Sequence, residues 1–87
     1  MKWYVYIVRC SDTSLYTGIT LDIKRRIGEH NGNNARGAKS LRGKRPVKLV
    51  YYEEFLSQKE ARQRELAIKN WTRSYKLKLI ERTQCKT

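Results

Sequence analysis

Apolar residues near the N-terminus fall into two short runs separated by polar residues. The first run, Trp3 to Arg9, is rich in aromatic and β-branched side chains, and the second extends from Leu15 to Ile19. These residue types favour strands, and the sequence SDTS between the runs is typical of a turn. The pattern therefore predicts a β-hairpin.

The next apolar residues recur with a helical period. Ile23 and Ile27 lie one turn apart in the sequence LDIKRRIGEHNG, as expected for the apolar side of a helix. Asp22 stands at the N-cap position, and the pair Asn31-Gly32 is typical of a helix end. This segment predicts a short amphipathic helix.

Three further elements are predicted after a segment without periodicity. Residues 31–46, NGNNARGAKSLRGKRP, are rich in glycine and basic side chains and predict a long loop. The sequence VKLVYYEEF predicts a third strand. Ser57 and Glu60 have the spacing of a capping box, so a helix is expected to begin there. Thr72 is expected to cap a last helix through YKLKLIE.

The predicted element order is β-β-α-β-α-α. A chain of 87 residues has room for one hydrophobic core, so we expect a single domain over residues 1–82 and a C-terminal tail over residues 83–87. Because the hairpin comes first and the helices suit a layer over one sheet, the expected fold class is α+β. The sheet is expected to be small, three-stranded and largely antiparallel, with helices flanking it.

The charge of the chain is strongly positive. The chain contains 20 Lys and Arg and 8 Asp and Glu, which gives a net charge of +12. The release of counterions from phosphates favours binding of such a chain to polyanions, so DNA is the expected partner, with RNA not excluded. No membrane partner is expected, because no segment pairs a basic face with a wide apolar face and no apolar run could span a bilayer.

The cellular compartment is predicted from the N-terminus and the cysteines. The chain begins with a β-like apolar run rather than a signal peptide, which predicts a cytoplasmic protein. Cys10 and Cys85 are accordingly expected to be reduced thiols. The two cysteines and the single histidine have unrelated spacings, so no zinc site is expected.

Two tyrosines of the predicted hairpin are candidate site residues. If the turn has an odd number of residues, Tyr6 and Tyr16 share one face with Gly18, whose missing side chain leaves space beside them. On a helical wheel, Arg26 and His30 are neighbours at the edge of the stripe that faces the sheet. Either the tyrosines pack in the core and the two helical side chains extend past its edge, or all four converge on a site.

One of the two glutamates in the second predicted helix is already explained by the capping box. The other, Glu65, lies in the apolar stripe between Ala61 and Ile68. An ionised carboxylate is costly there unless it is paired or metal-bound. A structural ion pair is the alternative to a metal, with Arg26 or Lys69 as the expected partner.

The predicted loop carries a group of basic side chains. These are Arg36, Lys39, Arg42, Lys44 and Arg45. They follow no apolar periodicity, so they are not expected in the core. Solvation is one explanation for such a charge run, and contact with the phosphates of a nucleic acid is the other.

The hairpin and the segments after it resemble the GIY-YIG nuclease superfamily. The sequence YVYI stands at the first motif and YTG, residues 16–18, at the second, and the interval between the motif tyrosines is ten residues. The segments YTGIT, DIKRRIGEHN, GAKSLRGKRPVKLVYYEEF and RELAIKNW are most similar to the small stand-alone bacterial branch, the YhbQ-like proteins. The resemblance covers residues 3 to about 80.

The resemblance implies a metal-dependent endonuclease that hydrolyses phosphodiester bonds in DNA, with structured or repair substrates among those expected. The catalytic positions of the superfamily fall on Tyr6, Tyr16, Arg26, His30 and Glu65. One divalent ion, Mg²⁺ or Mn²⁺, is implied at Glu65. An unperturbed tyrosine is only roughly one part in a thousand phenolate at pH 7. The general base therefore stays open among Tyr6, Tyr16 and His30.

Three departures from the superfamily pattern keep other interpretations open. The first motif lacks the glycine of the family name, and Ile19 stands where some repair nucleases carry a lysine. Ser40 and Leu41 stand where the branch usually has an aromatic residue and a threonine. The alternatives are a catalytically silent nucleic-acid-binding module and an adaptor within a larger nuclease complex. The sequence does not indicate the oligomeric state.

Overall fold

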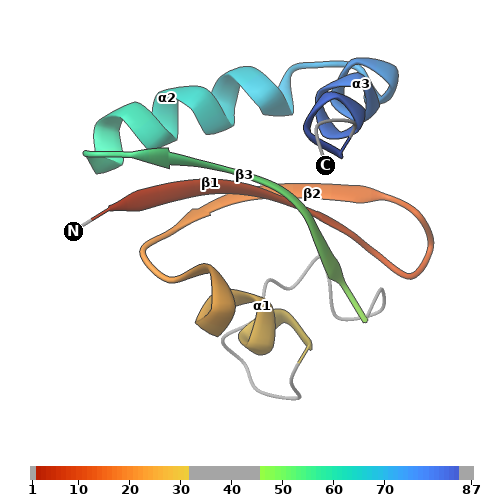
Figure 1. The fold of residues 1–87 in the computed structure, drawn as a ribbon, viewed down its shortest axis with the longest axis horizontal. Helices are drawn as coiled ribbons and strands as arrows, with labels where there is room; N and C mark the ends of the chain where they lie inside the picture. Colours follow the sequence, from red (N-terminus) through yellow and green to blue (C-terminus); the bar gives the residue numbers. More distant parts are fainter. Residues whose placement is uncertain (1, 32–45, 85–87) are drawn as a thin grey trace.

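The computed structural model describes residues 2–31 and 46–84 of the 87-residue chain. Within these residues, three strands form one antiparallel sheet in the order β2-β1-β3, flanked by three helices (Figure 1). The elements in chain order are β1 (Trp3–Arg9), β2 (Leu15–Thr20), α1 (Ile23–Asn31), β3 (Lys48–Phe55), α2 (Gln58–Lys69) and α3 (Arg73–Gln84). The predicted α+β class and element order are confirmed.

The β1–β2 hairpin sets the positions of the motif tyrosines. Its connection covers residues 10–14, an odd number, so that Val8 pairs with Tyr16 and Tyr6 pairs with Gly18. Side chains alternate between the two faces of a strand. The expected common face of Tyr6, Tyr16 and Gly18 is therefore confirmed.

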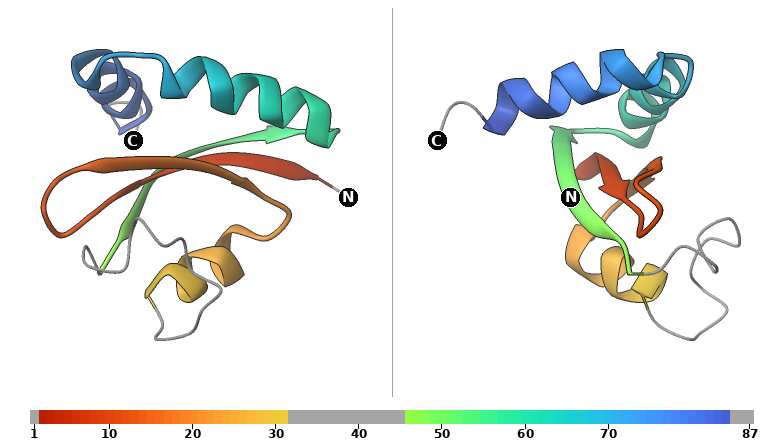
Figure 2. Two further views of the ribbon diagram at one scale, coloured as in Figure 1. Left: turned by 180° about the vertical axis from the view of Figure 1, so that it is seen from behind. Right: turned by 90° about the vertical axis from the view of Figure 1, so that its right-hand side faces the viewer.

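Each face of the sheet is covered by helices. Helices α2 and α3 lie over one face and α1 lies over the other, as Figure 1 and Figure 2 show from different directions. The core on the first side contains Val5, Ile7, Ala61, Ile68 and Ile80, and the core on the second contains Tyr6, Val8, Cys10 and Val47. Consecutive residues of β1 thus face opposite cores, as the alternation along a strand requires.

Side-chain hydrogen bonds fix the helix starts as the sequence predicts. Asp22 Oδ1 accepts from the backbone N–H three residues later at 3.1 Å, and Thr72 Oγ1 accepts in the same way at 3.3 Å. At α2, Ser57 Oγ accepts from the Glu60 N–H at 3.2 Å and donates to Glu60 Oε1 at 3.1 Å. The capping box is confirmed, although the two side chains meet each other rather than both reaching the backbone.

The last helix is longer than the sequence YKLKLIE that predicted it. It begins at Arg73 and ends at Gln84. No glycine or proline follows YKLKLIE within this range, so no residue there interrupts the helix. In the described part of the chain, none of the helices is both long enough and apolar enough to cross a bilayer.

One side-chain bridge joins the end of α1 to the residue before β3. Asn31 Nδ2 donates to the Val47 carbonyl at 3.1 Å, and the Val47 N–H donates to Asn31 Oδ1 at 2.6 Å. Val47 is buried, so its backbone groups need partners, and a single amide side chain supplies both. The bridge fixes where α1 ends relative to the sheet.

Candidate active site

Tyr6 and His30 form a buried hydrogen-bonded pair. The Tyr6 phenol oxygen lies 2.8 Å from His30 Nε2, and the two residues are 1% and 2% exposed. The phenol passes over Gly18, where a Cβ atom would lie 2.6 Å from the phenol oxygen and so could not be accommodated. The glycine is therefore needed for the Tyr6 ring to reach His30.

Tyr16 completes an aromatic cluster around this pair. Its ring centroid lies 6.4 Å from that of Tyr6, and 5.4 Å from that of His30 in an edge-to-face arrangement. The centroids of Tyr6 and His30 are 6.0 Å apart. The structure thus brings together the two hairpin tyrosines and the helical histidine, which come from three different elements, β1, β2 and α1.

Arg26 lies one turn before His30 on the same side of α1. Its guanidinium is close enough to the Tyr6 phenol to lower the pKa of that group, and its Nη1 atom lies 2.9 Å from Glu29 Oε1. The side chain is 29% exposed and helps to line a hollow of about 350 Å³, together with Arg25 and the end of β2. Arg26 therefore links the buried tyrosine to open surface, rather than only extending past the edge of the core.

The protonation of the pair follows from its burial. Burial raises the pKa of Tyr6 to about 12, the charges of Tyr16 and Glu65 add to the rise, and Arg26 opposes it. Burial also lowers the pKa of His30, as does the charge of Arg26, while Glu29 acts in the opposite direction. At neutral pH the phenol is therefore protonated and the imidazole neutral, and the imidazole tautomer decides which of the two groups donates in this hydrogen bond.

Glu65 lies on α2, which packs on the other side of the sheet. The residue is 4% exposed, as its place in the apolar stripe predicts. Its Oε2 atom lies 3.3 Å from Lys69 Nζ, and its Oε1 atom lies 3.2 Å from Arg62 Nη1. The predicted partner Lys69 is confirmed, whereas Arg26 is wrong as a partner because it lies over the opposite face. Arg62 was not considered, although its i, i+3 spacing from Glu65 indicates it.

The Glu65 carboxylate nevertheless acts on the same tyrosine. Its charge contributes to the raised pKa of Tyr6, whose phenol lies over Gly18 of the edge strand β2. Helix α2 packs against both β1 and β2. The candidate site is thus built around the β2 edge, with the tyrosines, Arg26 and His30 on one side and Glu65 on the other.

Glu65 is suited to a metal that needs only one protein ligand. Within the described residues, no three His, Cys, Asp or Glu side chains are grouped as a metal site. Mg²⁺ accepts a single carboxylate when water and substrate fill its other positions. The buried Oε1 atom has no hydrogen-bond partner among the described residues, although the Arg62 guanidinium forms an ion pair with it at 3.2 Å. Arg62 is 62% exposed at its side chain, so it can move aside without disturbing the core.

Thr17 is a polar residue of this region that the sequence analysis did not single out. It is 3% exposed, and its Oγ1 atom also lacks a hydrogen-bond partner among the described residues. Thr17 lies between Leu15 and Ile19, which pack on the α2 side of the sheet, so its side chain faces α2. A threonine between two inward-facing apolar positions of a strand was the signal that could have identified it.

The predicted nucleic-acid-binding residues of the loop lie outside the described residues. These are Arg36, Lys39, Arg42, Lys44 and Arg45. Their role stays a prediction from the sequence. Cys85 also lies outside the described residues, whereas Cys10 is a buried free thiol.

The fold and the tyrosines, arginine and glutamate around one edge strand agree with what the resemblance to the GIY-YIG nuclease superfamily implies. The chain belongs to the GIY-YIG family, because the sequence model of the GIY-YIG catalytic domain matches residues 2–78. The family membership expected from YVYI and YTG is therefore confirmed, and it supports a nuclease-like function.

The relatives of the chain are UPF0213 proteins of similar length. One from Staphylococcus haemolyticus is 52% identical over 80 residues, which are 92% of this chain and 95% of that protein. Another, from Clostridium perfringens, is 54% identical over 77 residues, which are 88% of this chain and 81% of that protein. These matches confirm the similarity to a branch of small stand-alone proteins. The designation UPF0213 specifies no activity, metal or substrate.

Solved structures agree with the fold. The solution NMR structure of the UPF0213 protein from Bacillus halodurans has a TM-score of 0.59 and 42% identity, and covers 93% of this chain and 84% of that one. The solution NMR structure of a protein from E. faecalis has a TM-score of 0.64 and 33% identity, and covers 98% of this chain and 88% of that one.

Replacing Thr17 by valine tests whether its hydroxyl has a partner. We expect Thr17→Val to leave the free energy of unfolding unchanged or to raise it by up to about 1 kcal/mol, because the lost hydroxyl makes no hydrogen bond. Urea unfolding measures the change. Thr20→Val is the matched control on the same strand, since Thr20 Oγ1 donates to the Asp22 carbonyl at 3.2 Å and accepts from its N–H at 3.1 Å. The control should lose roughly 0.5–1.5 kcal/mol, and an equal loss in Thr17→Val would contradict the assignment.

The lowered pKa of His30 predicts how stability depends on pH. The unfolded chain has the ordinary pKa of 6.5 and the folded chain a lower one. The unfolded chain thus takes up the proton first, so the contribution of His30 to stability is complete above pH 6.5 and decreases as the pH falls through 6.5 toward the folded pKa. Urea unfolding between about pH 8 and 5.5 measures this slope. In His30→Gln the slope should be smaller, and an unchanged slope would exclude His30 as its source.

Proposed function

We propose that the protein is a divalent-metal-dependent endonuclease that hydrolyses phosphodiester bonds in DNA, including structured or repair substrates. The observation that carries this proposal is the buried Tyr6–His30 hydrogen bond at 2.8 Å, with Arg26 beside the same phenol and Glu65 across the β2 edge. A core tyrosine needs one partner for its hydroxyl. Two ionisable neighbours and a nearby carboxylate exceed what packing requires.

In the proposed reaction Arg26 holds the scissile phosphate. Its guanidinium is planar and matches two phosphate oxygens at once, and its side chain already reaches a hollow open to solvent. Positive charge on these oxygens lowers the repulsion that a phosphodiester exerts on an attacking water. A Mg²⁺ or Mn²⁺ ion held by Glu65 would supply further positive charge for the leaving oxygen.

Tyr6 and His30 handle the proton of the attacking water. The water oxygen forms a bond to phosphorus while one water proton passes to the Tyr6 phenol oxygen, and the Tyr6 proton passes to His30 Nε2. The phosphorus bond to the leaving oxygen breaks with its electron pair on that oxygen, which takes a proton from solvent, and His30 becomes an imidazolium. Because the pKa of Tyr6 is raised to about 12, the phenol serves as a base only through this coupled transfer. Tyr16 borders the pair, with its ring edge-to-face against His30.

The proposed DNA partner follows from the charge of the chain. A net charge of +12 favours binding to a phosphate backbone. We assign contacts with the backbone to the five basic loop residues named above. The free thiol of Cys10 fits the reducing conditions of the cytoplasm, where we place the protein.

A non-catalytic role in binding nucleic acid, alone or within a larger complex, is the second candidate. It is favoured by the ion pairs of Glu65 with Lys69 and Arg62, which balance the carboxylate without a metal. The two candidates differ in whether Glu65 is needed for turnover. A binding module does not need it.

Replacing Glu65 separates the two functions. We expect Glu65→Gln to abolish cleavage of single-stranded, duplex, flap and junction DNA in Mg²⁺ or Mn²⁺, because it removes the metal ligand at constant size, and we expect EDTA to have the same effect on the parent. DNA affinity should stay unchanged or rise, since a negative charge is lost. Glu60→Gln is the matched control on the same helix and should cut normally. Cleavage by both variants would refute the metal assignment. If the parent binds DNA but cuts none of these substrates, the non-catalytic binding module is the correct function.

Replacing Arg26 tests its contact with the reacting phosphate. Arg26→Lys keeps the charge but loses the planar fork, so we expect kcat to fall by about tenfold or more while DNA affinity changes less. Arg82→Lys is the control, because Arg82 is exposed and lies on α3, over the other face of the sheet. Equal losses of kcat and affinity in Arg26→Lys would make Arg26 a docking residue.

A further inference from the structure

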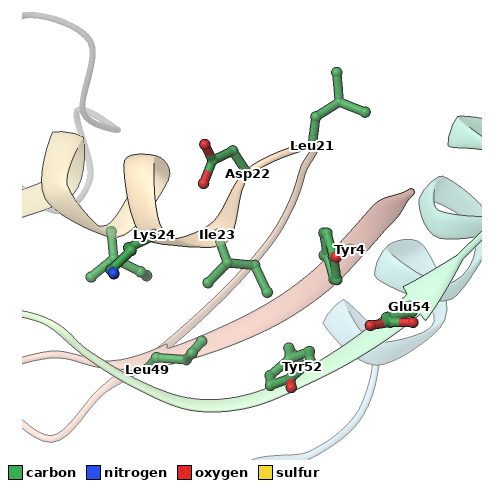
Figure 3. Close-up of a pocket in the computed structure, with 9 residues that line it drawn as sticks. Tyr4, Leu21, Asp22, Ile23, Lys24, Leu49, Tyr52 and Glu54 are labelled. Atoms are coloured by element: carbon green, nitrogen blue, oxygen red, sulfur yellow. The ribbon is translucent and has the colours of Figure 1, made fainter. Parts of the chain in front are cut away.

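A second hollow lies between α1 and the sheet, beside the candidate active site. Its volume is about 590 Å³. Tyr4, Tyr52 and Leu49 come from the strands, and Ile23 comes from α1 (Figure 3). Ile27 of α1 also lines the hollow. The proposed chemistry uses none of these side chains. The hollow is nevertheless on the Tyr6 side of the sheet, because Tyr52 is the cross-strand neighbour of Tyr6 on β3.

The hollow presents aromatic side chains to solvent. Tyr52 is 52% exposed, and its ring meets that of Tyr4 edge-to-face, with the centroids 6.1 Å apart. The apolar residues Ile23 and Leu49 face the rings from α1 and β3 (Figure 3). Flat aromatic faces with apolar surroundings are what a nucleobase stacks on in single-stranded nucleic acid.

The charges around the hollow differ from those of the rest of the molecule. Asp22, whose Oδ1 caps α1, and Glu54, whose Oε2 lies 3.3 Å from Lys2 Nζ, border it with carboxylates, and Lys24 supplies the single positive charge of its lining (Figure 3). A net charge of +12 makes this a local exception. Carboxylates repel phosphate groups but accept hydrogen bonds from the amino groups of bases. The lining is therefore suited to a base rather than to the backbone.

The hollow adjoins the place proposed for the scissile phosphate. Leu21 and Asp22 line both this hollow and the smaller one that contains Arg26. A nucleotide whose phosphate contacts Arg26 can therefore direct a neighbouring base over Leu21 and toward the tyrosines. A base that is paired and stacked within a duplex cannot enter between α1 and the sheet.

We infer that this hollow binds one unpaired nucleobase of the DNA substrate, next to the phosphate at Arg26. The inference rests on the proposed function in taking DNA as the partner, and it adds the class of substrate. DNA with an unpaired nucleotide near the cut is preferred over a continuous duplex, because only an unpaired base reaches Tyr4 and Tyr52.

Binding of DNA with and without a base at the unpaired position tests the inference. One oligonucleotide carries a single unpaired 2-aminopurine between paired segments, and its twin carries an abasic site at the same position. Fluorescence anisotropy without metal gives the two affinities, and 2-aminopurine fluorescence reports stacking. The full-length parent should bind the base-containing DNA about tenfold more tightly than its twin and quench its fluorescence.

Substitution of Tyr52 locates the effect. Tyr52→Leu should remove the preference and the quenching, whereas Tyr52→Phe should retain both because it keeps the ring. Tyr75→Leu is the matched control, since Tyr75 is 57% exposed but lies on α3 over the other face of the sheet. Thermal unfolding of each variant confirms that it is folded.

Equal affinity of the parent for the two oligonucleotides would overturn the inference, and so would equal effects of Tyr52→Leu and Tyr75→Leu. In that case the hollow suits an apolar side chain of a protein partner instead. Failure of the proposed function is a separate outcome, because the binding experiment needs no cleavage. If the parent prefers the base-containing DNA but cuts no DNA, the proposed endonuclease function is refuted and the binding of a base in the hollow is retained.

Discussion

The passage of the Tyr6 phenol across Gly18 is the contact on which the rest of the site depends. A hydrogen atom is the only substituent that fits at residue 18, since a Cβ would lie 2.6 Å from the phenol oxygen. The ring can therefore lie flat over the edge strand and meet His30 at 2.8 Å. This hydrogen bond sets the distance of α1 from the sheet. It thereby also places Arg26, one turn earlier, against the same phenol.

Burial determines the protonation state of this pair before substrate binds. It makes Tyr6 a weaker acid and His30 a weaker base than in water, so the resting pair is neutral and carries no buried charge. In the proposed reaction His30 becomes positive beside Arg26, which is unfavourable without an anion. A bound phosphate supplies that anion. The proton path is therefore suited to operate only when substrate is present, which limits unproductive ionisation of the empty site.

Local patterns in the sequence were sufficient for the elements and for most of the site. The hairpin register follows from an odd turn length, and the burial of Glu65 follows from its place in a helical stripe. Capping by Asp22 and Ser57 follows from residue type and spacing. These features depend on neighbours within a few residues along the chain, so they can be derived before the fold is known.

Features that depend on packing between elements could not be derived in this way. The unpaired hydroxyl of Thr17 becomes evident only when α2 is placed over β2. Arg26 is excluded as a partner of Glu65 because the two residues lie on opposite faces of the sheet, which the sequence alone does not show. The hollow beside Tyr52 depends on the angle at which α1 leaves the sheet. No periodicity along the chain specifies that angle.

The amide bridge between Asn31 and Val47 has a consequence for how the family can diversify. Two hydrogen bonds close the chain at the base of the segment between these residues, so α1 and β3 are fixed to each other independently of what connects them. As a general rule, doubling the length of a loop costs only about 0.6 kcal/mol in closure entropy. The sequence and length of this segment can therefore vary between relatives without changing the hydrogen bond between Tyr6 and His30. Under the proposed function, contacts with the DNA backbone are therefore free to evolve separately from bond cleavage.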